Sequence, residues 1–132
     1  KTQAQKDQAL AVAKGTCEQY PYSGLAASNY VELLFQSGKH QELVDYLRKQ
    51  SALSRTNPDY HMYLARSYEA LGKKSMAFAA TGDMYALLDN PRAAVYQFEL
   101  AQKANDGDFY IMSEIDAKLR ELRQKVLDQK KD

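Results

Sequence analysis

Apolar residues recur at intervals of three and four along almost the whole chain, and no window shows sustained alternation of apolar and polar residues. This spacing is typical of amphipathic α-helices. Gly38 and Gly72 each follow such a stretch and predict its end. Asn57-Pro58 and Asn90-Pro91 each combine an N-cap residue with a proline suited to the first helical position. The pattern therefore predicts an all-α chain of about seven helices, near residues 3–19, 24–37, 40–54, 58–71, 74–88, 91–104 and 108–129.

The two helix-ending glycines, Gly38 and Gly72, lie 34 residues apart. That step is the length of a tetratricopeptide repeat, a helix-turn-helix unit that stacks into a solenoid. A glycine in the turn adopts the left-handed conformation that the turn requires. The unit that begins at Pro58 resembles the repeat pattern at Leu64, Ala65, Tyr68, Gly72 and Ala77. The unit that begins at Gly24 resembles it more weakly, at Tyr30, Val31, Leu34, Gly38 and Leu43. We therefore expect a right-handed α-solenoid of the tetratricopeptide class.

The repeat register treats residues 1–132 as a single domain. Ala9 and Pro21 fall on the small-residue and proline positions of a unit whose first helix would precede the chain, so we interpret the chain as a fragment that begins inside a repeat. The expected parts are a partial repeat, two repeats, an overlapping half-shifted repeat and a capping helix, at residues 1–22, 23–57, 58–90, 75–104 and 108–129.

The half-shifted repeat rests on a second, looser match. Asp89 takes the glycine position, and the other matching residues are Gly82, Tyr85, Ala94, Phe98 and Ala101. A glycine inside a helix, as at position 82, lowers helix stability by ~1 kcal/mol relative to alanine. A close helix crossing, with no room for a side chain, would explain why glycine is found there. The alternative is that such a loose pattern matches by chance.

Both ends of the chain carry apolar stripes. The last helix is expected to cover the end of the stack with Met112, Ile115, Leu119, Leu122 and Val126. A coiled-coil partner for this stripe is the alternative. In the first helix Leu10, Ala13, Cys17 and Tyr20 share a face, so Cys17 is expected to be a small core residue rather than a reactive thiol.

Composition indicates a globular chain without an electrostatic preference for nucleic acid or anionic membranes. Of 132 residues, 45% are hydrophobic, and 18 basic against 17 acidic residues give a net charge of +1. No apolar run approaches the ~20 residues of a membrane-spanning helix. A single cysteine, Cys17, excludes an internal disulfide and a cysteine-only zinc site.

Residues for catalysis or metal binding form no recognisable pattern. His40 and His61 have no metal-ligand spacing with each other or with Cys17, and no H-E-x-x-H motif, nucleophile elbow or phosphate loop is present. His40 is interpreted as a turn residue and His61 as a partly exposed helix residue. Asp106 and Asp108 flank a turn glycine, and either is able to cap the last helix. We expect neither enzymatic activity nor a cofactor in this chain.

The second half of the chain, roughly residues 60–125, resembles a known family. The stretches EALGKKSMAFAATGDMYALLDNPRAAVYQFELAQ and SEIDAKLRELRQ are similar to the C-terminal tetratricopeptide domain of periplasmic bacterial zinc metalloproteases, typified by the β-barrel assembly-enhancing protease. The resemblance implies the non-catalytic half of a two-domain protease, with zinc held by the other domain. It also implies a periplasmic location and a role in binding outer-membrane β-barrel proteins or their assembly machinery.

In this repeat class the first helix of each unit lines the concave side, because the second helices pack behind it. The expected protein-binding groove therefore contains Asn29, Glu32, Gln36, Tyr63, Arg66 and Glu69. Tyrosine and arginine are enriched among binding hot spots. The alternative is that these are ordinary solvated positions. The expected partner is a protein or peptide client, or the upstream protease domain, with no nucleic acid and no membrane insertion.

Two other functions fit the same helices. One is a free-standing adaptor or co-chaperone in the cytoplasm, and the other is a structural dimerisation module. Co-chaperones of this class hold a C-terminal carboxylate with lysine, arginine and asparagine on the first helices. The corresponding positions here are Ser28, Glu32, Met62 and Arg66. Only the arginine suits an anion, which disfavours that mode of binding.

Overall fold

The computed structural model describes residues 2–131, and in that range the chain is helical without a strand. The elements are α1 (Gln3–Gln19), α2 (Gly24–Gln36), α3 (His40–Lys49), the short 3₁₀-helix η1 (Ser51–Arg55), α4 (Pro58–Ala70), α5 (Lys74–Leu87), α6 (Pro91–Ala104) and α7 (Phe109–Lys131). The predicted all-α class is confirmed. With one exception, the expected helix ranges agree with the observed ones to within a residue or two.

The exception is the helix expected over residues 40–54. α3 already ends at Lys49, because Gln50 leaves the helical region with φ −101° and ψ 40°. The serines that follow compete for backbone hydrogen bonds, as serines near helix ends do. The Ser54 hydroxyl donates to the carbonyl oxygen of Ser51 over 2.6 Å. The chain therefore tightens into η1 before α4 begins.

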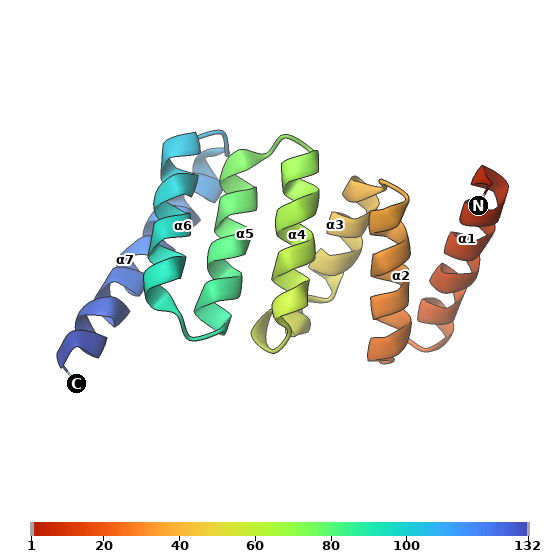
Figure 1. The fold of residues 1–132 in the computed structure, drawn as a ribbon, viewed down its shortest axis with the longest axis horizontal. Helices are drawn as coiled ribbons and strands as arrows, with labels where there is room; N and C mark the ends of the chain where they lie inside the picture. Colours follow the sequence, from red (N-terminus) through yellow and green to blue (C-terminus); the bar gives the residue numbers. More distant parts are fainter. Residues whose placement is uncertain (1, 132) are drawn as a thin grey trace.

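The helices pack mainly against their neighbours in sequence. In Figure 1, α2, α4, α5 and α6 stand side by side, α1 lies at the N-terminal end, and α3 and α7 lie behind this row. The most extensive contacts join α4 to α5 and α5 to α6, while α7 packs on α6 and α5 and α3 packs on α4 and α2. α4, α5 and α6 therefore form a layer, with α3 and α7 placed on one of its faces.

Three helix ends share one turn geometry. The left-handed conformation predicted for both glycines is confirmed, with φ of 71° at Gly38 and 75° at Gly72. Asp89 adopts the same conformation, with φ of 58°, at the end of α5. In each turn the next N–H donates to the carbonyl oxygen five residues earlier, for example from Lys73 to Tyr68 over 2.9 Å. This is the Schellman pattern, which satisfies otherwise unpaired carbonyls at helix ends.

Two apolar cores lie along the stack. The larger one joins residues of α1 to α5, and Leu34 and Leu43 are fully buried in it. The smaller one joins α6 to α7 around Phe98 and Leu119. The close helix crossing expected at Gly82 is confirmed, because a Cβ added there would lie 2.6 Å from Cε2 of Phe98. The absence of a side chain at this position lets α5 pack directly on the phenyl ring.

The turn between α6 and α7 also holds the start of α5. The backbone N–H groups of Lys74 and Ser75 each donate to the carboxylate of Asp106 over 2.7 Å. These bonds, led by the one from Ser75, hold the pKa of Asp106 below its ordinary value. Asp108 instead caps α7, by accepting from the N–H of Ile111 over 2.9 Å. Of the two candidate caps for the last helix, Asp108 therefore has that role and Asp106 caps α5.

The end helices bury most of the residues expected to share their apolar faces, but Met112 and Val126 are only half-buried and Tyr20, which follows the end of α1, is 57% exposed. In α7, Ile115, Leu119 and Leu122 are buried. In α1, Cys17 is a buried free thiol whose Sγ–H donates to the carbonyl oxygen of Ala26 over 3.3 Å. The predicted core position of Cys17 is therefore confirmed. Val12, on another side of α1, is 63% exposed.

Candidate binding grooves

Three of the six predicted site residues form one hydrogen-bonded chain between α2 and α4. The Tyr63 hydroxyl donates to Glu32, and the Gln36 side-chain amide donates to the same carboxylate over 3.0 Å. The bond to Glu32 is the largest cause that raises the pKa of Tyr63 to about 12. These side chains therefore join the two helices. Their hydrogen bonds to each other occupy polar groups that were expected to bind a partner.

The other predicted residues lie around this chain. The Arg66 guanidinium carbon is 6.0 Å from the ring centroid of Phe35, within the range of a cation–π contact. Glu69 is exposed one turn further along α4. Asn29 is exposed on α2, and it shares a hollow of about 430 Å³ with Glu32 and Tyr63. Arg66 and Glu69 line a different hollow, and Gln36 lines neither of the two, so the predicted set does not form one site.

The second of these hollows, here called the front groove, runs over α4, α5 and α6 on the face away from α3 and α7. It encloses about 710 Å³. Its floor is half-buried and apolar, with Met62, Phe78, Met84 and Leu100. Its exposed rim is charged, with Arg66, Glu69, Lys74 and Lys103. Within residues 2–131 none of these four rim residues takes part in an ion pair.

Sequence reasoning missed the α5 and α6 parts of the front groove. The repeat over residues 58–90 makes α5 a second helix, at the back of the stack, whereas the half-shifted repeat over residues 75–104 makes it a first helix. The predicted groove took no residue from it. A signal was nevertheless present, because KSMAFAATGDMYAL has apolar residues on every side of the helix. A helix that is apolar all round has more than one face in contact with something other than water. In α5 one such face packs in the stack and another lines the front groove.

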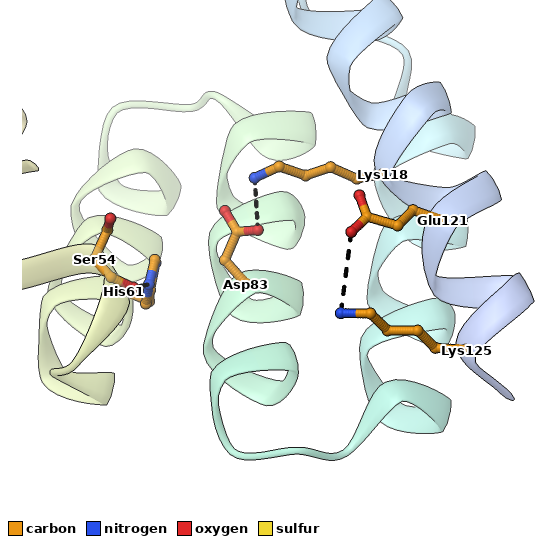
Figure 2. A network of polar contacts seen from close by, with 6 residues as sticks. All are labelled: Ser54, His61, Asp83, Lys118, Glu121 and Lys125. Atoms are coloured by element: carbon orange, nitrogen blue, oxygen red, sulfur yellow. Dashed lines mark hydrogen bonds and ion pairs between the residues drawn. The ribbon is translucent and has the colours of Figure 1, made fainter. Parts of the chain in front are cut away.

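A larger concavity, the back groove, lies on the opposite face of the layer. It encloses about 880 Å³ between α3 and η1 on one side and α7 on the other, with α4 and α5 as its floor. Figure 2 shows Ser54 and His61 at one side, Asp83 on α5 in the middle, and Lys118, Glu121 and Lys125 on α7. The sequence did not predict this groove, because its two walls are more than 50 residues apart in the chain.

His61 corrects one expectation. It was predicted to be partly exposed, but its side chain is buried, and Nε2 donates to the carbonyl oxygen of Ser54 over 2.7 Å. The cause is η1, which turns back over the start of α4 and supplies this acceptor. His40 begins α3, and its Nδ1 lies 3.1 Å from the buried Ser67 hydroxyl on α4. Both histidines therefore connect neighbouring elements.

Ion pairs mark the α7 wall of the back groove. Lys118 Nζ lies 2.7 Å from Asp83 Oδ1, and Lys125 Nζ lies 4.0 Å from Glu121 Oε1 (Figure 2). The first pair joins α7 to α5 and is only half exposed on the lysine side, whereas the second lies within α7 and is well exposed. Exposed pairs of the second kind contribute little to stability.

In the part of the chain that the structure describes, no group of three or more histidine, cysteine, aspartate or glutamate residues is placed to hold a metal ion. Among the same residues, no helix combines the length and apolar character needed to cross a membrane. Comparison with known proteins returns no significant match to a family, to a curated protein or to a solved structure.

Proposed function

We propose that this chain is a protein-interaction scaffold of the tetratricopeptide class, a right-handed α-solenoid that binds segments of other polypeptides. Three observations support the assignment to this class. The glycine turns recur at a 34-residue step with the same left-handed conformation. The helices pack mainly on their sequence neighbours. A long last helix covers the end of the smaller core.

The front groove is the observation that carries the proposal. An apolar floor inside a charged rim is the arrangement of protein–protein interfaces. Met62 and Met84 lie on that floor, and flexible methionines suit a surface that binds several different partners. Arg66, which the sequence analysis selected, lies on the rim, where arginine is a favoured binding residue. A client segment with apolar side chains between polar ones fits this groove.

The identity of the client rests on the resemblance of residues 60–125 to the periplasmic metalloprotease family. On that basis we propose that the chain is the non-catalytic module of such a protease. It would bind outer-membrane β-barrel proteins, or their assembly machinery, in the periplasm. Zinc and the catalytic residues would belong to the protease domain, and this chain would itself hold no cofactor.

Binding of an unfolded β-barrel protein tests the proposal. A fluorescent outer-membrane β-barrel protein, diluted from urea, should raise its anisotropy when the chain is added. The combined exchange Arg66→Ala and Glu69→Ala should weaken binding roughly tenfold, about 1.4 kcal/mol. The matched control is Asp45→Ala with Lys49→Ala, an exposed charged pair on α3, and it should bind like the parent chain.

A photo-crosslinking amino acid at Thr81, which lines the front groove, should capture the same client, and one at Asp45 should not. Equal capture from both positions would show that the front groove is not the binding site. Binding to a folded cytoplasmic chaperone in place of the unfolded β-barrel protein would favour the adaptor function. Self-association in sedimentation experiments, with no client binding, would favour a dimerisation module.

A further inference from the structure

The back groove is independent of the front groove. The two lie on opposite faces of the α4–α6 layer and share no lining residue. An occupant of one therefore leaves the other open. The back groove is the larger of the two hollows. The side chains that line it indicate what kind of second ligand would bind there.

One wall of the back groove carries two arginines. Arg48 on α3 and Arg55 in η1 both line the groove and are exposed. Within residues 2–131 neither takes part in an ion pair. A guanidinium group binds carboxylates through paired hydrogen bonds, more strongly than neutral groups bind each other. This wall therefore has anion-binding capacity that the described part of the chain does not use.

Two tyrosines on α4 add donors beside these arginines. Tyr60 and Tyr68 line the groove with buried rings. Burial is the main cause that raises the pKa of both phenols, and the positive charge of Arg48 acts against it in both. Arg48 and both tyrosines line the same groove. Both phenols stay protonated at neutral pH and keep an O–H group to donate.

On α7, which forms the opposite wall, most charged side chains that line the groove already have a partner. Lys118 and Lys125 each have a carboxylate partner, Asp83 and Glu121 respectively. Glu114 is an exposed carboxylate on the same helix. Between the walls the floor is apolar, with Leu64, Met76, Ala79 and Ala80. The floor is therefore mostly apolar, with the Asp83–Lys118 pair across its middle, and the groove is positive at the Arg48–Arg55 end.

We propose that the back groove binds a second polypeptide segment, one with aspartate or glutamate side chains that meet Arg48 and Arg55 and with apolar side chains that lie on the α4–α5 floor. The positive end selects acidic residues, and the α7 wall, with two paired lysines and the carboxylate of Glu114, does not attract them. This ligand differs in charge from the client of the front groove, and both are able to bind together.

A short peptide of leucine, alanine and glutamate, blocked at both ends and labelled with an electrically neutral BODIPY dye, tests this proposal. Blocking the ends leaves the side-chain carboxylates as its only negative groups. The chain should bind it, and Arg48→Gln combined with Arg55→Gln should weaken binding at least about tenfold. Added salt should weaken binding to the parent chain more than to this variant, because the contact at the arginine end is ionic. Unchanged circular dichroism of the variant would exclude a folding defect.

The matched control is Lys49→Gln with Arg92→Gln, two exposed cations outside the groove, and it should not change affinity. Equal weakening by both double variants would overturn the proposal, since general positive charge would then explain binding. Failure to bind, or equal binding of a peptide with lysine in place of glutamate, would also overturn it. So would tighter binding of a single-stranded oligonucleotide. Loss of β-barrel client binding through the front-groove exchanges, with peptide binding intact, separates the two sites.

Discussion

The contact between Gly82 and Phe98 allows a sharp test of packing in the second half of the stack. A Cβ at position 82 would lie 2.6 Å from Cε2 and 2.7 Å from Cδ2 of the Phe98 ring. Real Cβ contacts are essentially never closer than 3.0 Å, so the ring or α5 must move. Phe98 is fully buried between α5, α6 and α7. Moving it disturbs the whole smaller core.

Two effects of Gly82→Ala oppose each other. Alanine has the higher helix propensity, worth ~1 kcal/mol in a helix interior. Overpacking of a close-packed core costs roughly 1–3 kcal/mol, and the two shortest contacts here make the upper half of that range the better expectation. We therefore expect Gly82→Ala to lower the free energy of unfolding by about 1–2 kcal/mol.

Urea unfolding followed by far-UV circular dichroism measures this change. A double-mutant cycle with Phe98→Leu supplies the control, because the smaller side chain frees space beside position 82. The two exchanges together should be less harmful than the sum of the single ones, with a coupling energy of at least about 1 kcal/mol. If Gly82→Ala instead stabilises the chain by the whole ~1 kcal/mol of the helix-propensity difference, the Phe98 ring moves aside without strain. That result would refute the expected overpacking.

Four further exchanges address the turns and the helix links. Asp89→Gly should raise stability by about 1 kcal/mol, and Gly72→Ala should lower it by a similar amount, because both positions have positive φ; thermal unfolding distinguishes the signs. Asp106→Ala should cost about 1 kcal/mol. Since the folded pKa of Asp106 is lowered, its contribution is present above the unfolded value and declines as pH falls below about 4, so the gap between the variant and the parent chain should close in acid. Tyr63→Phe should remove an ionisation near pH 12 from the ultraviolet absorbance titration. The pKa of this phenol is higher in the folded state, so the stabilisation from its bond to Glu32 is present below pH 10 and lost as pH rises toward 12.

Local signals predicted most of the fold. Glycine in left-handed turns and the Asn-Pro pairs act within a few residues, and they placed the starts of α4 and α6 and the ends of α2 and α4. What sequence reasoning missed depends on contacts between distant residues. Asp106 caps a helix that begins 32 residues earlier. His61 is buried because η1, an element that the apolar pattern did not distinguish from α3, folds over it.

The candidate grooves were harder to predict than the helices. Repeat logic selected Arg66 and Glu69, which do line the front groove, but it had no means to see that Glu32 and Tyr63 bind each other. The predicted groove also took no residue from α5, although the half-shifted repeat makes that helix a first helix. The back groove arises only when α3 and α7 lie on the same face of one layer. Helix periodicity carries no information about that placement.

The bond from Asp106 to the start of α5 has a consequence for how the chain opens. In a stack where each helix touches only its neighbours, the ends fray first and opening spreads inward. Here α5 loses its N-terminal cap whenever the α6–α7 turn separates from it. α5, α6 and α7 therefore form one cooperative unit whose amide protons should exchange together. Within residues 2–131 no distant turn caps a helix before α4 in this way, and α2 and α3 are linked to α4 only through side chains such as Glu32–Tyr63 and His40–Ser67. These helices should therefore exchange in smaller, separate steps.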